Sequence, residues 1–128
     1  MVADLRVAVI DDDVVSRAYI RRALAIFPRV LVVEFDRVAG FVQDHEGGTR
    51  YDCVILDHMM PQQVGLDLVA PLVQLGVPVV FETAWEAAAH DARERGAFHV
   101  LVKPYGLEEL REAVRDALAL PPHEGATP

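Results

Sequence analysis

Residues 51–61, with the sequence YDCVILDHMMP, contain an apolar run that ends in an acidic residue. The run from Val54 to Leu56 is typical of a short buried strand, because such residues pack well on a pleated surface. Pro61 cannot continue a strand ladder, so we expect the strand to end near Asp57. Taken alone, Asp57 is better explained as a turn residue that caps the next segment. Acidic residues elsewhere in the chain change this interpretation.

The composition predicts one packed domain. The chain has 128 residues, of which 52% are hydrophobic and 25% are charged, as in a globular protein with one core. Its net charge of −8 disfavours direct binding to nucleic acid, because phosphate backbones repel an acidic surface. No apolar run in the sequence has the length of a membrane span, and the single cysteine, Cys53, cannot form an internal disulfide. We therefore expect a cytoplasmic domain that binds neither membranes nor nucleic acid directly.

Apolar runs and helical periodicity alternate five times along the chain. We expect strands at Leu5–Ile10, Val30–Phe35, Cys53–Asp57, Pro78–Thr83 and Phe98–Val102. We expect helices at Val14–Phe27, from Val38 to a stop at Gly47, and at Leu66–Leu75, Ala84–Arg95 and Leu107–Leu118. Pro71 lies inside the third helix and should kink or break it. Residues 1–119 form the predicted domain, and residues 120–128 are expected to be a flexible tail with no output domain.

The alternation predicts a parallel sheet with helices on both faces, in which ligands bind at the carboxyl ends of the strands. The polar residues that follow the predicted strands all fall at this edge: Asp11, Asp12, Asp57, Thr83 and Lys103. Three crowded carboxylates repel one another, and Mg²⁺ would relieve the repulsion. With a metal beside it, one carboxylate is a candidate nucleophile toward a phosphoryl group, and Lys103 and Thr83 are candidates to hold its oxygens.

This ordered set of motifs resembles the receiver domain of two-component response regulators, over Leu5 to Leu118. The motifs are Asp11-Asp12, Asp57 with Met60-Pro61 and Gly65, Thr83-Ala84, and Lys103-Pro104. Each motif alone has little specificity, whereas the ordered set is specific. The resemblance implies a three-layer, doubly wound, flavodoxin-like α/β fold. Its five-stranded parallel sheet would have the strand order 2-1-3-4-5, with five helices.

The resemblance also implies an acceptor and a metal site. Asp57 would accept a phosphoryl group from a sensor histidine kinase or a histidine phosphotransfer protein. Asp12 and Asp57 would bind Mg²⁺ directly, together with the backbone carbonyl of Met59, and Asp11 would act through water. Such a domain is a switch rather than a metabolic enzyme, although it catalyses its own phosphorylation and hydrolysis.

A second group of residues would respond to the phosphoryl group. Thr83, Ala84 and Lys103 would form its binding and switching set, and Pro104 is a candidate cis-proline. The switch would change the binding of a downstream protein target, or pass the phosphate on in a relay. Receivers often pair through the fourth helix, fifth strand and fifth helix, so a homodimer through this face, including Leu107 to Leu118, is a further expectation.

The chain departs from the family at the residue three positions before the lysine. Receivers usually have Tyr or Phe there, and this chain has Val100. Phe98, Trp85 or Tyr105 are candidates to replace the missing aromatic ring. In receivers, the residues two positions after the acceptor and two after the threonine tune hydrolysis. Here they are Met59 and Trp85, and two large side chains should hinder an attacking water, so we expect slow loss of the phosphate.

Two residues have no role in this scheme. Glu82 would be the penultimate residue of the fourth strand, where an apolar residue is usual, and strand alternation points it away from Thr83. His58 follows the candidate acceptor and is most simply a packing or solvated residue.

Two alternative functions remain open. The first is a degenerate receiver that binds proteins without being phosphorylated; the complete set of polar residues disfavours it, whereas Val100 favours it. The second is an aspartyl-phosphate phosphatase of the haloacid dehalogenase type. That type needs a second aspartate two residues after the nucleophile, where this chain has Met59, and a cap domain over the substrate.

Overall fold

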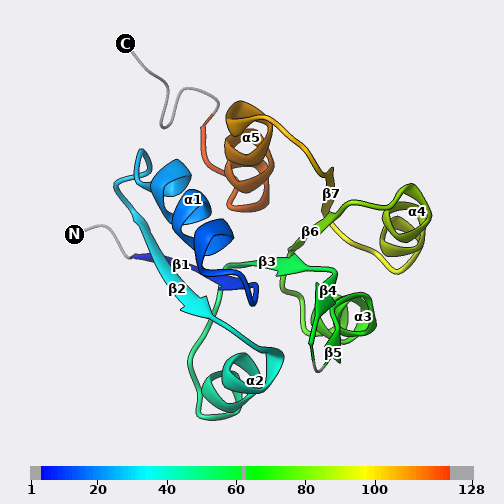
Figure 1. The fold of residues 1–128 in the computed structure, drawn as a ribbon. Coiled ribbons are helices and arrows are strands. Elements are labelled where there is room, and N and C mark those ends of the chain that lie inside the picture. Colours follow the sequence, from blue (N-terminus) through cyan, green and yellow to red (C-terminus); the bar gives the residue numbers. More distant parts are fainter. Residues whose placement is uncertain (1–3, 62, 122–128) are drawn as a thin grey trace.

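The computed structural model describes residues 4–61 and 63–121, and its centre is a five-stranded parallel sheet (Figure 1). The strands are β1 (Leu5–Ile10), β2 (Val30–Phe35), β3 (Cys53–Asp57), β6 (Val79–Thr83) and β7 (His99–Val102). Their spatial order is β2-β1-β3-β6-β7, which is the predicted order 2-1-3-4-5 when these five strands are counted along the chain. The doubly wound fold is therefore confirmed, with its reversal of strand order between β1 and β3.

Helices cover both faces of the sheet (Figure 1). One face carries α1 (Val14–Leu24) and α5 (Leu107–Ala117), and the other carries α2 (Val38–Glu46), α3 (Leu66–Gln74) and α4 (Glu86–Glu94). Successive side chains of a strand point to opposite faces. In β3, for example, Cys53 and Ile55 pack with α1 and α5, whereas Val54 and Leu56 pack with the other three helices. Burial on both faces explains why the strands are continuous apolar runs rather than alternating ones.

The strand register brings the polar residues to one edge of the sheet. The last paired residues of β1 and β3 place Asp11 beside Asp57 at the next position. Strand β6 ends at Thr83, and β7 ends one residue before Lys103. The carboxyl ends of parallel strands share one edge, so residues far apart in the sequence become neighbours there.

A short antiparallel hairpin follows β3 and is not predicted from the sequence. Its strands are β4 (Met59–Met60) and β5 (Gln63–Val64). The hairpin returns to the end of β3 at Gly65, whose N–H donates to the carbonyl oxygen of His58 at 2.7 Å. A Cβ on Gly65 would lie 2.0 Å from the backbone oxygen of Asp57, so only glycine permits this close approach.

The third helix, α3, was expected to kink or break at Pro71, and it continues through this residue without a break. Val69 and Leu72, on either side of the proline, are buried. Their packing against the sheet stabilises the helix despite the hydrogen bond that proline cannot make.

Two helix boundaries differ from the sequence expectation by more than one residue. Helix α1 ends at Leu24 rather than at Phe27, and α4 begins at Glu86 rather than at Ala84. Phe27 remains buried although it lies beyond the helix. The apolar spacing therefore predicts which residues are buried better than it predicts where the last helical turn ends.

The packed chain extends to Leu120, which is 8% exposed and lies in the core formed with α1 and α5. Pro121 is exposed, and residues 122–128 of the predicted tail lie outside the described residues. Across the described ranges, every helix is too short or too polar to cross a bilayer.

Candidate functional site

Three carboxylates from two strand ends form an acidic cluster. Asp11 and Asp12 follow β1, and Asp57 ends β3; one carboxylate oxygen from each lies within 4.8 Å of the others. Asp11 and Asp57 are buried, whereas Asp12 is exposed. Carboxylate oxygens gathered in this way suit a hard divalent cation such as Mg²⁺, and the exposed member leaves the cluster open to solvent.

Asp11 shows that these residues fit a cation. Its Oδ1 accepts a hydrogen bond from the backbone N–H of Asp13 at 2.9 Å. Its Oδ2 is buried and has no hydrogen-bond partner among the residues that the structure describes. Burial, together with the negative charge of Asp57, raises the pKa of Asp11 to about 6. A cation, directly or through a water ligand, would give Oδ2 the partner that the protein does not supply.

Lys103 joins the acidic cluster from the end of β7. Its Nζ donates a hydrogen bond to Oδ1 of Asp57 at 2.8 Å. Burial alone would lower the pKa of Lys103, but the hydrogen bond and charge of Asp57, with the charges of Glu82 and Asp11, raise it. The side chain is therefore an ammonium at neutral pH and offsets part of the carboxylate repulsion. The Lys103–Pro104 peptide bond is cis, as predicted.

Thr83 lies at the same edge, but its hydroxyl has other partners. Its Oγ1 lies 2.9 Å from Nδ1 of His58 and accepts the backbone N–H of Trp85 at 3.1 Å. Within the described part of the chain, no hydrogen bond joins this hydroxyl to Asp57. Ala84, the other predicted member of this set, is exposed directly after Thr83.

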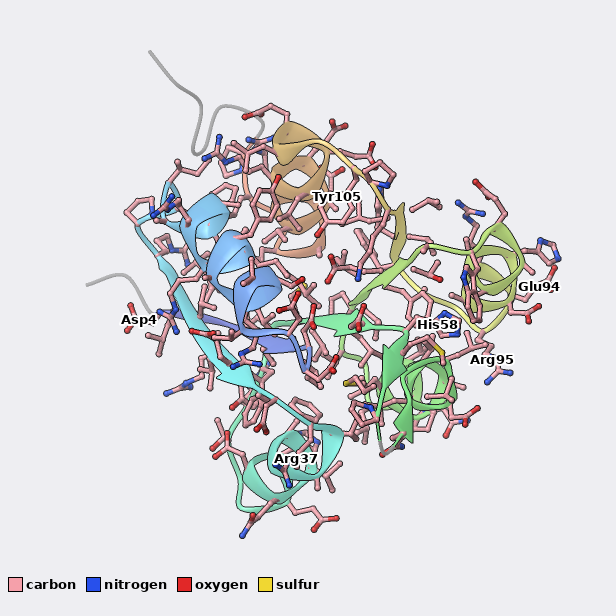
Figure 2. All side chains as sticks on the ribbon, viewed as in Figure 1. Asp4, Arg37, His58, Glu94, Arg95 and Tyr105 are labelled. Carbon is pink, nitrogen blue, oxygen red and sulfur yellow. The ribbon has the colours of Figure 1, made fainter. Side chains whose placement is uncertain are left out.

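His58 is buried, so the packing interpretation is correct and the solvated one is wrong. Its ring lies edge-on to that of Trp85, with 5.3 Å between centroids, and 5.5 Å from that of Phe81. Figure 2 shows His58 between the β4–β5 hairpin and α4. Burial lowers the pKa of His58 below 6.5. The bond to Thr83 was missed, because the two residues are 25 positions apart and meet only through the loops.

Met59 and Trp85 flank the acceptor edge and are both largely exposed, at 50% and 58% of their surface. Met59, the candidate metal ligand through its backbone carbonyl, begins β4 two residues after Asp57. Trp85 is the N-terminal flanking residue of α4. Both residues are therefore exposed to solvent at the starts of the segments that follow Asp57 and Thr83.

The position of the missing aromatic residue is filled by core packing. Val100 is buried with the residues of the α2, α3 and α4 face. Of the three candidate replacements, Phe98 is half exposed and Tyr105 is bonded to Glu82. Trp85 donates its backbone N–H to Oγ1 of Thr83, while its ring packs edge-on against His58.

Glu82 is buried on the opposite face of β6 from Thr83, as strand alternation predicts. Its side chain is 1% exposed, and the Tyr105 hydroxyl donates a hydrogen bond to its Oε1. Tyr105 lies on the α5 side of the sheet (Figure 2). Burial raises the pKa of Glu82 to about 7, and burial beside this acid also raises the pKa of Tyr105. The sequence identified Glu82 as unusual but not its partner.

Comparison with known proteins places this arrangement in a family. The family model for the response regulator receiver domain matches residues 7–115. The response regulator protein TmoT of Ectopseudomonas mendocina is 33% identical over 118 residues, which cover 89% of this chain and 52% of TmoT. The response regulator MprA of Mycobacterium avium is 31% identical, with 89% and 51% covered. The solved receiver domain of NarL from Mycobacterium tuberculosis has a TM-score of 0.76 at 25% identity, covering 92% of this chain and 98% of that domain.

The chain therefore belongs to the response regulator receiver family, and it contains a receiver domain of a two-component system. It spans about half the length of the curated relatives that it matches.

Proposed function

We propose that this receiver accepts a phosphoryl group on Asp57 from a phosphohistidine of a sensor histidine kinase or a phosphotransfer protein. One observation carries the proposal. One carboxylate oxygen of Asp57 lies within 4.8 Å of oxygens of Asp11 and Asp12, and its Oδ1 accepts a hydrogen bond from the Lys103 ammonium at 2.8 Å. A nucleophilic carboxylate between a cation site and a fixed positive charge is the arrangement that phosphoryl transfer needs.

The residues have distinct roles in the proposed transfer. An oxygen of Asp57 attacks phosphorus, the bond from phosphorus to the donor nitrogen breaks, and the donor imidazole leaves with that electron pair. Asp11, Asp12, Asp57 and the Met59 carbonyl would hold Mg²⁺, which supplies positive charge to the phosphoryl oxygens when bound. Lys103 keeps the acceptor carboxylate oriented and neutralises charge that develops during transfer.

Phosphorylation then acts through the residues next to the acceptor. Thr83 and the N–H of Ala84 would bind the phosphoryl oxygens once the Thr83 hydroxyl turns toward Asp57. This movement would change the face formed by α4, β7 and α5, and so the affinity of that face for a protein target or a second copy of the chain. The proposal includes a cytoplasmic location and no direct contact with nucleic acid or membrane.

The test is mass spectrometry after incubation with acetyl phosphate and Mg²⁺. The wild-type chain should gain the mass of one phosphoryl group, and Asp57→Asn should gain none. Chelating the metal with EDTA should also prevent the gain. Asp52→Asn is a matched control, because Asp52 is an aspartate that precedes β3 and binds the Arg6 N–H at 2.9 Å. It should leave the gain unchanged.

Each alternative predicts a different result. A receiver that only binds proteins would show no mass gain in the wild type under any of these conditions. A phosphatase would release phosphate repeatedly from small phosphate esters, so turnover of such an ester would favour that activity. A gain that persists in Asp57→Asn would move the acceptor to another residue.

A further inference from the structure

The hydroxyl of Thr83 is held by the side chain of His58, in the loop that follows Asp57. His58 directly follows Asp57, and its Nδ1 lies 2.9 Å from Oγ1 of Thr83. Both side chains are buried, at 6% and 1% exposure, so water does not readily replace either partner. The contact joins the ends of β3 and β6, the two strands that carry the acceptor and the threonine.

We propose that His58 is a positioning residue that holds Thr83 in the resting state, and that phosphorylation must break this contact for the domain to switch. The inference rests on the proposed phosphorylation of Asp57. In this proposal, His58 restrains switching from the loop that follows β3. Val100 of β7, at the position where receivers usually have an aromatic residue, has no ring for this role.

The two demands on the Thr83 hydroxyl compete. The hydroxyl already accepts the backbone N–H of Trp85 at 3.1 Å, and His58 occupies a second direction around the oxygen. A hydroxyl has one proton and two acceptor positions. The competition belongs to the tautomer in which Nδ1 of His58 carries no proton, because the Thr83 hydroxyl then donates its one proton to Nδ1. To donate that proton to a phosphoryl oxygen on Asp57 instead, the hydroxyl must rotate, and the His58 ring then loses its buried partner. The resting state is therefore favoured by the free energy of this contact.

The surroundings of His58 keep the ring in place. It packs against Phe81 of β6 at 5.5 Å and lies edge-on to Trp85 at 5.3 Å. Its own backbone N–H donates to the carbonyl oxygen of Glu82 at 3.0 Å, and its carbonyl accepts the N–H of Gly65 at 2.7 Å. With the backbone bonded on both sides, the ring cannot easily follow Thr83 toward Asp57. The contact is therefore broken by the movement rather than carried along with it.

Trp85 reports on this contact. It is the single tryptophan of the chain, and it touches both partners, through its N–H to Thr83 and its ring to His58. Rotation of the hydroxyl would change the surroundings of the indole. Tryptophan fluorescence during titration with beryllofluoride and Mg²⁺, which together mimic a phosphoryl group on an aspartate, therefore measures the switch directly.

The experiment compares two substitutions of the same residue. His58→Phe keeps a ring against Phe81 and Trp85 but loses the nitrogen, whereas His58→Asn loses the ring but keeps a polar atom near the position of Nδ1. His58→Phe should bind beryllofluoride about three- to tenfold more tightly than wild type, because one buried hydrogen bond no longer opposes switching. His58→Asn should remain within about twofold of wild type.

A double-mutant cycle separates this role from a general effect on packing. In a Thr83→Ala background there is no hydroxyl to hold, so His58→Phe should no longer tighten beryllofluoride binding. An unchanged affinity in His58→Phe alone, or an equal gain with and without the Thr83 hydroxyl, would overturn the inference. If wild type binds no beryllofluoride, the proposed function fails first and the inference fails with it.

A measurement on the wild-type chain covers the case in which His58→Phe does not fold. With ¹⁵N-labelled histidine, the Nδ1 resonance of His58 should shift when beryllofluoride and Mg²⁺ saturate the protein, because the bond to Thr83 is lost. His90, an exposed histidine in α4 that pairs with Glu94, is the internal control. Saturation that leaves the His58 Nδ1 resonance in place would contradict the inference.

Discussion

Glu82 and Thr83 are neighbours at the end of β6, yet their side chains lie on opposite faces of the sheet and have different partners. Thr83 contacts His58 and Trp85 on the α4 side, through an imidazole ring and a backbone N–H. Glu82 contacts Tyr105 on the α5 side, as a buried acid. The first contact can exchange its partner for a phosphoryl oxygen. The second is enclosed, and in the described part of the chain its Oε2 has no hydrogen-bond partner.

This difference suggests that Thr83 contributes to switching and Glu82 to the stability of the fold. A hydrogen bond between neutral groups costs little to exchange when a better acceptor arrives beside it. A buried carboxylic acid costs much more to ionise, because the charge loses the solvation that water provides. We therefore expect changes on the Thr83 side to alter the response to phosphoryl mimics, and changes on the Glu82 side to alter the free energy of unfolding.

The largest effect is expected from the pH dependence that Glu82 confers. Its pKa is about 7 in the folded chain and 4.5 as the unperturbed value, so the folded state binds the proton more tightly. Stability from this group is complete below pH 4.5 and is lost as pH rises through 7. Compared with Glu82→Gln, wild type should lose on the order of 2 to 3 kcal/mol between pH 5 and pH 8. Urea unfolding at several pH values measures the difference.

The comparison with Glu82→Gln cancels the titrating groups that do not interact with Glu82, and the difference includes its electrostatic interaction with Asp11, Asp57 and Lys103. Asp11, whose raised pKa also removes stability with rising pH, is present in both proteins. The difference between the two free energies of unfolding should therefore be constant above pH 8 and again below pH 4.5. Between these limits it should change as Glu82 titrates. Parallel curves across the whole range would show that Glu82 does not titrate there.

A smaller effect is expected when Tyr105 loses its hydroxyl. Tyr105→Phe leaves Oε1 of Glu82 without its donor and should lower the free energy of unfolding by about 1 to 3 kcal/mol. The loss should be greater at pH 8 than at pH 5, because the ionised acid needs the donor more. Beryllofluoride affinity should change by no more than about twofold, since this pair lies on the other face of β6 from Thr83.

Tyr19 provides the matched control for Tyr105. It is an exposed tyrosine in α1, so Tyr19→Phe should change stability by no more than about 0.5 kcal/mol. A loss in Tyr105→Phe no larger than this would show that the buried pair adds nothing to stability. A large loss of beryllofluoride affinity would show that the two sides of β6 are coupled.

The smallest effect is expected on the lifetime of the phosphorylated form. Met59 and Trp85 are large, exposed residues two positions after Asp57 and Thr83, and we expect them to hinder an attacking water, so wild type should keep its phosphate for longer than seconds without a phosphatase. Met59→Asn introduces a group that can orient water and should speed hydrolysis by about tenfold or less. Release of phosphate from the purified phosphorylated protein, followed over time, measures the rate.

Val64 supplies the control for Met59. It pairs with Met59 across the β4–β5 hairpin and is also exposed, so Val64→Asn adds the same polar group to the same hairpin. It should leave the lifetime unchanged. Loss of phosphate from wild type within seconds, or equal acceleration by both substitutions, would contradict a shielding role for Met59.

Much of the fold and most of the acceptor edge could be predicted from the sequence. The five strands and their carboxyl-terminal polar residues follow from local patterns, since a buried parallel strand is a continuous apolar run. Pro71 misled the helix prediction because tertiary packing of Val69 and Leu72 overrides a local preference. The β4–β5 hairpin has strands of two residues each, too short for any periodicity to show.

The sequence by itself determined the order of strands and helices and the residue types at each strand end, because burial and turn preferences act over short stretches of chain. The tertiary structure alone decided which of these side chains touch. The bonds from His58 to Thr83 and from Tyr105 to Glu82 join residues 25 and 23 positions apart. Such contacts depend on loop paths and on the register between strands, and neither is encoded in a local pattern.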